Sequence, residues 1–240
     1  MISDLHIGLE YDLYKSGIVI QSQVEKFVKI LKKLIKMTKA KNLIILGDIK
    51  HKVPGSTIME DILIPRFFRA IKEDVQIILC KGNHDDGIEE ILPEGIKIYD
   101  SKGVKISKYG FFHGHGWPSK KLMQCDYLFM GHIQPSVEFV DKFRYRNRQQ
   151  VWLKGSLNKT AIKKKYKISK IGKLNLIVAP AFNKLSGSFA INTGKDLRGP
   201  FVLNKIFDLN QAKAYLLDGT YLGNVGMLTK NYKKILLEPL

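Results

Sequence analysis

Five apolar runs of this sequence end in short polar turns, and the turns together contain all six histidines of the chain. Each turn places histidine, aspartate, asparagine or glutamine at or just after the end of an expected β-strand. Histidines retained only for packing would not cluster in this way, so the turns restrict the function as well as the fold. The five stretches are Ile2–His6, Leu46–His51, Cys80–Asp85, Phe112–His115 and Met130–Gln134.

The segments between the first three turns are amphipathic and predict helices. Apolar residues at helical spacing follow Ile18, and Ser22 with Glu25 has the spacing of a capping box. A second helix is expected over residues 57–72. Pro65 lies inside this segment and is expected to kink the helix or split it in two.

Short apolar runs over Leu43–Leu46 and Val75–Cys80 predict buried strands on either side of the second helix. The alternation of strands and helices predicts parallel βαβ units and an α/β fold class. In such units the ligand-binding side chains lie at the carboxyl ends of the strands, where Asp4, Asp48 and Asn83 are placed.

Beyond a short acidic helix near residues 88–92, the apolar runs become shorter and predict a second, more antiparallel sheet. We expect one domain over residues 1–240, with the metal-site motifs in residues 4–135 and a basic part in residues 136–240. The strands expected first in the second sheet are Ile96–Tyr99, Val104–Ile106, Phe111–His113, Tyr127–Met130 and Val137–Phe143.

No apolar run is long enough to cross a bilayer, and the N-terminus lacks the pattern of a signal peptide. These features predict a cytoplasmic protein without a membrane partner. Cys80 and Cys125 lack metal-ligand spacing and are expected to be reduced, structural thiols. The oligomeric state is left open by the sequence.

The net charge of +18 comes entirely from the second part of the chain. Residues 1–100 contain 15 basic and 15 acidic residues, whereas residues 101–240 contain 25 and 7. Residues 142–173 contain 12 basic and no acidic residues, with aromatic residues among them. This stretch is either a nucleic-acid contact or a solvated lysine-rich surface, and its Trp152 and Tyr166 could equally point into the core.

The polar turns supply ligands for divalent metal ions. Asp4 and His6 are two residues apart, so in an extended chain both side chains can reach one ion. Four further strand ends offer Asp48, Asn83, His113 and His132. The set is too large for one ion with an open position and predicts two ions that share a carboxylate. Because such a pair activates water and holds phosphate, the predicted reaction is hydrolysis of a phosphate ester.

The ordered motifs D-x-H, G-D-x-x-H, G-N-H-D, H-G-H and a late G-H span Asp4 to Pro135 and resemble those of the calcineurin-type metallophosphoesterase superfamily. The segments Asp4–Glu10, Gly131–Pro135 and Pro180–Asn183 further resemble the archaeal SbcD-related phosphoesterases, which are kin of the bacterial ligase-associated ones. The resemblance implies a four-layer αββα sandwich, in which two mixed β-sheets are flanked by helices.

The resemblance also implies two divalent ions, with Mn²⁺ expected and Fe, Zn or Ni as alternatives. It assigns the first ion to Asp4 and His6 and makes Asp48 the bridge. The ligands that it assigns to the second ion are Asn83, His113 and His132. Relatives usually have a further histidine on the first ion where this chain has Gln134. An amide oxygen is a weaker ligand than imidazole, so we expect weaker binding of the first ion.

A second departure is that only three residues precede Asp4, where a strand of about 5 residues is usual. Either a strand is missing or the assigned start is late, and the first ion would then be less firmly held.

The catalytic residues that the resemblance and the neighbouring Asn83 suggest are His84 and Asp85. His84 would protonate or stabilise the leaving oxygen, and Asp85 would orient its ring. His115 is expected to face the phosphate, and His51 either contacts substrate or supports the Asp48 loop. Each of these polar residues taken alone could instead only cap a turn.

The predicted function is hydrolysis of phosphate esters, in particular phosphodiesters and with nucleic acid as a candidate partner, by direct attack of metal-bound hydroxide. Two alternatives use the same fold. One is a small-molecule phosphatase or cyclic-nucleotide phosphodiesterase with the same site, and the other is an interaction scaffold that has lost turnover. Retention of His84 and of most ligand positions favours an enzyme.

Overall fold

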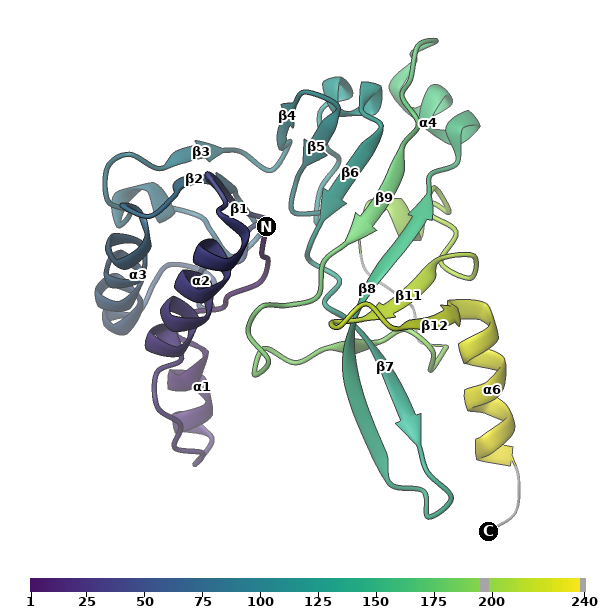
Figure 1. The fold of residues 1–240 in the computed structure, drawn as a ribbon, viewed down its shortest axis with the longest axis horizontal. Helices are drawn as coiled ribbons and strands as arrows, with labels where there is room; N and C mark the ends of the chain where they lie inside the picture. Colours follow the sequence, from purple (N-terminus) through teal and green to yellow (C-terminus); the bar gives the residue numbers. More distant parts are fainter. Residues whose placement is uncertain (195–198, 238–240) are drawn as a thin grey trace.

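The computed structural model describes residues 1–194 and 199–237, which form two β-sheets with helices packed against them (Figure 1). The first sheet contains β1 (Asn42–Ile45), β2 (Gln76–Cys80) and β3 (Lys97–Tyr99), and both pairings in it are parallel. Isolated bridges align residues 2–7 in parallel with β1 and the turn after it. The prediction that Lys97–Tyr99 belongs to the second sheet is therefore wrong, because this strand pairs with β2.

Three helices accompany the first sheet: α1 (Leu9–Lys15), α2 (Val24–Thr38) and α3 (Ile58–Ile71). The apolar sides of α2 and α3 form one core cluster with β1 and β2, and this cluster includes the fully buried Phe67 and Phe68. The predicted strand–helix–strand alternation is thus present. Helix α1 was not predicted by the sequence pattern.

The start of α2 differs from the predicted capping box. The Ser22 hydroxyl accepts a bond from the Val24 amide, but Glu25 pairs with Arg66 instead of reaching back. The free amide of Gln23 donates to the Glu10 carboxylate at 2.7 Å. A carboxylate from α1 therefore replaces the local cap that the sequence suggested.

Helix α3 begins with a complete capping box and continues through its proline. Thr57 accepts from the amide of Glu60, and the Glu60 carboxylate accepts from the amide of Thr57. Pro65 lies within a single helix, so of the two predicted outcomes, a kink or a division, the division does not occur. Proline removes one backbone hydrogen bond, and the buried aromatic face of α3 outweighs that loss.

The second sheet has nine strands in the order β10-β7-β8-β9-β6-β5-β4, with β11 paired to β8 and β12 paired to β11. It is mixed, since β6 is parallel to β5 and β9 whereas β8 is antiparallel to β7, β9 and β11. Its strands are β4 (Val104–Ile106), β5 (Tyr109–Phe111), β6 (Tyr127–Met130), β7 (Pro135–Val140), β8 (Arg146–Ser156), β9 (Asn175–Val178), β10 (Phe189–Ala190), β11 (Lys213–Leu216) and β12 (Tyr221–Asn224).

The second sheet contributes to two separate cores. Residues of β8 and β9 pack against α4 (Lys159–Tyr166), α5 (Pro200–Leu203) and α6 (Val225–Leu237) in the larger cluster. A smaller cluster lies between the two sheets and brings together residues of β1, β2, β5, β6 and β8. Short 3₁₀ helices occur at Ile88–Glu90 and Lys120–Gln124. The layers follow the predicted αββα order, with the first sheet parallel rather than mixed.

The basic stretch 142–173 does not form one continuous groove. It runs from the β7–β8 hairpin along β8 to α4, at opposite ends of the second sheet (Figure 1). Trp152 packs between the sheets, and Tyr166 donates its hydroxyl to Pro118 O at 2.8 Å, so both point inward. Phe143 and Tyr145, at the hairpin, are 77% and 71% exposed.

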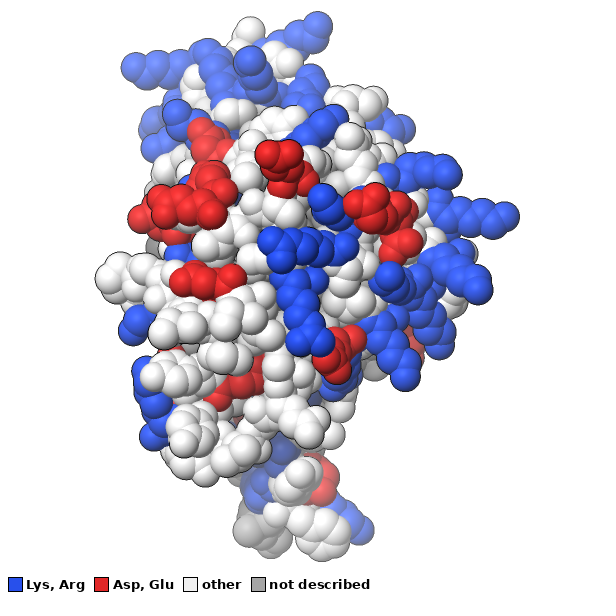
Figure 2. All heavy atoms as spheres, turned by 90° about the vertical axis from the view of Figure 1, so that its left-hand side faces the viewer, with Lys and Arg blue, Asp and Glu red and all other residues white. Residues whose placement is uncertain are grey.

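The face that carries the first sheet and its helices has mixed charge. Figure 2, which shows this side, has acidic residues interspersed among basic ones. This agrees with the balanced charge of residues 1–100. Within residues 1–194 and 199–237, no helix has the length and apolar character needed to span a membrane.

Candidate metal centre

Two sets of metal-ligating side chains meet at the carboxyl ends of the strands, and Asp48 belongs to both. We call His6, Asp48 and His84 the first triplet, and Asp48, His113 and His132 the second triplet. Within each triplet the ligand atoms lie within 4.8 Å of one another. Oδ2 of Asp48 lies 3.7 Å from Nε2 of His6 and 3.2 Å from Nε2 of His113. One carboxylate thus belongs to both candidate ligand groups.

Two glycines allow these turns to approach each other closely. A Cβ atom on Gly82 would collide with the Asp48 carboxylate, and one on Gly47 would collide with the backbone of Gly82. Gly47 also has φ of +79°, which side chains disfavour. Glycine is therefore required before Asp48 and before Asn83, because the turn after β1 packs directly on the turn after β2.

The backbone of the site is held in an uncommon conformation. Five of the predicted site residues have left-handed φ angles: Asp4 (56°), His6 (42°), Asp48 (53°), His132 (66°) and Gln134 (50°). Residues other than glycine seldom adopt this region, and they do so mainly where surrounding structure enforces it at functional sites.

Asp4 is completely buried and is the centre of a hydrogen-bond cluster. It accepts from the Ser3 hydroxyl, from the amide of His132 at 3.3 Å and from Nε2 of Gln134 at 3.2 Å. Burial raises the pKa of Asp4 to about 6. A bound cation would oppose that shift, because a nearby positive charge favours the carboxylate form.

Gln134 lies against both residues predicted for the first ion. Its Nε2 is 2.9 Å from Nε2 of His6, and its Oε1 accepts from the Ser186 hydroxyl at 3.2 Å. The two ends of an amide have nearly the same shape, so a half-turn places the oxygen at His6 and Asp4. The predicted position beside the first ion therefore fits, and ligation by Gln134 stays a prediction.

His113 is completely buried, and its Nδ1 contacts the carbonyl oxygen of Leu46. Its Nε2 lies 3.2 Å from Oδ2 of Asp48, at the distance of an ion pair but without the alignment of a strict hydrogen bond. Burial lowers the pKa of His113, but the Asp48 carboxylate outweighs burial and raises that pKa to about 9. Burial raises the pKa of Asp48, but the nearby His113 outweighs burial and lowers this pKa well below its usual value. A buried imidazole nitrogen beside a charged carboxylate is a ligand set that suits a divalent ion.

His84 is oriented by a backbone carbonyl. Its Nδ1 lies 2.7 Å from the oxygen of His51, which can only accept, so Nδ1 carries the proton and donates. The His84 amide also donates to Oδ1 of Asp48 at 3.1 Å. Nε2 of His84 is then the nitrogen left to face a substrate.

Asp85 has a different role from the one predicted. Its carboxylate is completely buried and accepts from the amides of Ile49 and Gly82 at 2.7 and 2.8 Å. It thus joins the turn after β1 to the turn after β2. The prediction that Asp85 orients the His84 ring is wrong, because His51 O makes that contact.

Comparison with known proteins identifies the family of this chain. A model of the calcineurin-like phosphoesterase family matches residues 1–216. The chain belongs to this family. It is a metal-dependent hydrolase by membership, and no curated protein sequence matches it.

Two solved structures are similar to this phosphoesterase. Nuclease MPE of Pseudomonas putida has 20% identity and a TM-score of 0.53, with 92% of this chain and 85% of that chain covered. YfcE, a phosphoesterase from E. coli, has 21% identity and a TM-score of 0.37, with 57% of this chain and 69% of that chain covered. The first similarity supports the two-sheet α/β fold.

Three other predicted residues of the phosphoesterase lie at or near the triplets. The His115 ring centroid is 5.3 Å from that of His113, so this half-buried ring lies beside the second triplet. The His51 ring is 5.5 Å from that of His6, and its Nε2 lies 3.2 Å from Oδ2 of Asp12. Asn83 is exposed on the turn before His84, and its predicted role as a ligand stays a prediction.

Several residues that shape the centre were missed by sequence reasoning. Glu60 accepts from the amides of His51 and Lys52 at 2.8 and 2.7 Å, and thereby fixes the loop that orients His84. The capping-box spacing with Thr57 was the available signal. Asn183, quoted only as part of a motif, donates to Leu5 O at 2.9 Å and supports the N-terminal segment. Asp12 gave no sequence signal.

Proposed function

We propose that this chain is a binuclear metal-dependent phosphodiesterase whose substrate is nucleic acid. The observation that carries the proposal is the sharing of Asp48 by two ligand triplets whose atoms lie within 4.8 Å of one another. A single carboxylate between two sets of nitrogen and oxygen ligands is the arrangement that a two-ion site requires. Mn²⁺ is the proposed ion, with Fe, Zn or Ni as alternatives, because the ligands combine imidazole and carboxylate.

The proposed ligands divide between the two ions. Asp4, His6 and Gln134 would hold the first ion, and Asp48 would contact both. The first triplet thus contributes His6 and Asp48 as ligands, and its third member, His84, is reserved for the leaving oxygen. Asn83, His113 and His132 would hold the second ion. When bound, the ions supply an acidified water for attack on phosphorus and positive charge for the phosphate oxygens.

The protein supplies the remaining chemistry through His84 and the rings around it. In its doubly protonated form His84 donates Nδ1–H to His51 O and keeps Nε2–H for the leaving oxygen. The turn after β2 fixes this ring beside Asp48, so the proton donor and the ligand sets move together. His115 lies beside the second triplet and is the proposed contact for a phosphate oxygen.

Nucleic acid is proposed as the substrate because of charge and resemblance. The chain carries a net charge of +18, which favours a polyanionic partner. The motifs resemble those of SbcD-related phosphoesterases, and the structure that shares the fold is called a nuclease. A phosphodiester has an esterified oxygen on both sides of phosphorus, so His84 would act on one of them as it leaves.

Hydrolysis of two simple substrates tests the proposal. With Mn²⁺, we expect turnover of bis(p-nitrophenyl) phosphate to exceed that of p-nitrophenyl phosphate. His84→Ala should lower kcat by about 10²–10⁴-fold, as expected for loss of a general acid. Asp86→Ala, an exposed change two residues away, serves as the matched control. Preference for the monoester would favour a small-molecule phosphatase, and no turnover with any ion would favour a scaffold.

A further inference from the structure

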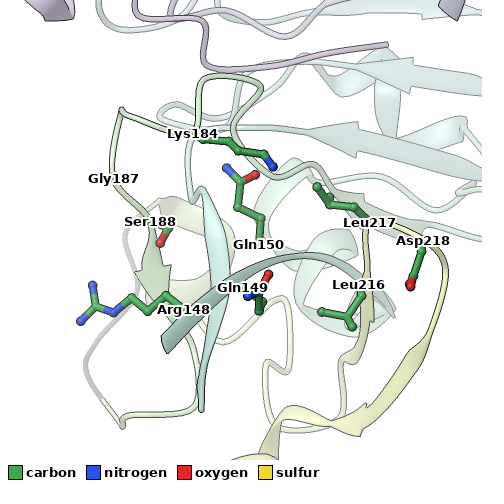
Figure 3. A pocket seen from close by; sticks show the side chains of 9 residues that line it. All are labelled: Arg148, Gln149, Gln150, Lys184, Gly187, Ser188, Leu216, Leu217 and Asp218. Atoms are coloured by element: carbon green, nitrogen blue, oxygen red, sulfur yellow. The ribbon is translucent and has the colours of Figure 1, made fainter. Parts of the chain in front are cut away.

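A cavity of about 520 Å³ with both polar and apolar lining residues contains none of the proposed metal ligands and has no role in the proposed reaction. Three segments line it: β8, the loop between β9 and β10, and the turn between β11 and β12 (Figure 3). The cavity is large enough for a small organic group. Its lining residues on the first two segments are Arg148, Gln149, Gln150, Lys184, Gly187 and Ser188.

The loop between β9 and β10 connects this cavity to the ligands of the first ion. Lys184, Gly187 and Ser188 face the cavity. Between them, the Ser186 hydroxyl lies 2.8 Å from Asn183 O and 3.2 Å from the side-chain amide of Gln134. Gln134 in turn lies 2.9 Å from His6, nitrogen to nitrogen. Only one side chain therefore separates the wall of the cavity from a proposed metal ligand.

The lining has two cationic side chains, Lys184 and Arg148, and one acidic side chain, Asp218. Figure 3 shows Lys184 and Gln150 converging beside Leu217. Arg148 is paired with Glu138 at 2.8 Å, whereas Lys184 has no ion-pair partner in the part of the chain that the structure describes. The acidic group of the lining, Asp218, accepts the amide of Thr220 at 2.9 Å.

The other groups suit the base of a nucleotide. Gln150 Nε2 donates to Ala181 O at 2.9 Å, which leaves its Oε1 to accept from a ligand. Gln149 adds a second amide, and Leu216 and Leu217 supply apolar surface for a ring. A phosphate near Lys184 and a base against the leucines would together use the cationic, amide and apolar parts of the lining.

We propose that this cavity binds the nucleotide adjacent to the scissile phosphodiester of a single-stranded nucleic acid. The inference rests on the proposed phosphodiesterase function, since the neighbouring phosphate must lie on the two-ion site. Lys184 contacts the phosphate of the bound nucleotide, and Gln150 with Leu217 contacts its base. The cavity thereby favours an oligonucleotide over a small diester, which does not reach it.

Binding and turnover measured separately test this site. Fluorescence anisotropy with labelled dT10 and excess EDTA reports binding without hydrolysis. Lys184→Glu should weaken binding about tenfold, and Lys184→Gln should reduce the salt slope of the binding constant by about 0.7, as expected for loss of one phosphate contact on a single strand. Lys33→Glu, the same charge change on the exposed side of α2, is the matched control.

Turnover of bis(p-nitrophenyl) phosphate should be unchanged in both Lys184 variants. Equal weakening by Lys184→Glu and Lys33→Glu, or no binding of dT10 by the wild type, would overturn the subsite. Weakened dT10 binding accompanied by an equal loss of small-diester turnover would also overturn it. Absence of all turnover in the wild type would instead refute the proposed function, while the anisotropy result would still report on the cavity.

Discussion

Replacement of Glu60 by glutamine should weaken the fold and the centre together. The carboxylate is completely buried and accepts four hydrogen bonds. Oε1 accepts from the amides of His51 and Lys52, and Oε2 accepts from the amide and hydroxyl of Thr57. Glutamine keeps one oxygen and puts an NH₂ group in place of the other, so it cannot accept all four.

The less costly orientation keeps the oxygen toward His51 and turns the NH₂ group toward Thr57. The Thr57 hydroxyl can rotate and accept, but the Thr57 amide loses its acceptor. An orphaned donor costs about 1–3 kcal/mol, and the loss of charge assistance in the remaining bonds adds about 1 kcal/mol. Glu60→Gln should therefore lower the free energy of unfolding by about 2–4 kcal/mol.

The same change should lower activity, because the loop held by Glu60 carries the carbonyl that orients His84. Misplacement of a catalytic group by about 1 Å costs about 10²-fold in rate, so we expect kcat to fall by about 10-fold to 100-fold. Urea unfolding followed by tryptophan fluorescence measures stability, and Mn²⁺-dependent diester hydrolysis measures activity.

Glu25→Gln is the control for this experiment, because Glu25 is exposed and pairs with Arg66 at the surface. Its effect on stability should stay below about 1 kcal/mol. If Glu60→Gln changed stability no more than this control and left kcat intact, the reasoning about the loop would be refuted.

Three further changes test other parts of the structure. Gln134→His should tighten binding of the first ion in a calorimetric titration with Mn²⁺, and an unchanged affinity would contradict a ligand position there. Gly82→Ala should abolish binding of both ions while secondary structure by circular dichroism is retained, because its Cβ would displace the shared carboxylate. The Tyr232 hydroxyl and two arginines lower the pKa of Glu138 in the folded protein. The ionised Glu138 carboxylate therefore stabilises the fold fully above its ordinary pKa of 4.5. This stabilisation is lost as the pH falls through the lower pKa of the folded state. Glu138→Gln should be less stable than wild type at pH 7, with a difference that shrinks toward pH 3 in urea unfolding, and a difference that grew on acidification would contradict this sign.

Much of the centre was predictable from the sequence because its ligands follow strands directly. An apolar run that ends in a polar turn fixes both the strand and the place of the side chain after it. The structure accordingly brings His6, Asp48, His113 and His132 into two adjoining triplets. Strand partners were less predictable, as Lys97–Tyr99 shows, because a short strand carries no signal for the sheet that it joins.

The contacts that hold the turns in place were the part that local patterns missed. Glu60 lies on a helix and Asp85 lies in a turn, where acidic residues are ordinarily solvated, yet both are completely buried. Glu60 accepts from amides eight and nine residues before it, and Asp85 reaches 36 residues back to Ile49. The spacing between Asp85 and Ile49 encodes no such partner, because that pairing exists only after the strands have aligned.

The strands and the buried carboxylates make different contributions to the centre. The strands bring the ligands near one another, but the left-handed backbone at Asp4 and Asp48 is unfavourable and must be stabilised by neighbouring contacts. The buried acceptors supply that support, since Asp85 binds the amide that directly follows Asp48 and Glu60 binds the amide of His51. Loss of either acceptor should therefore release a whole turn rather than a single bond. For that reason substitutions at these two carboxylates should affect metal binding and catalysis although neither residue is a proposed ligand.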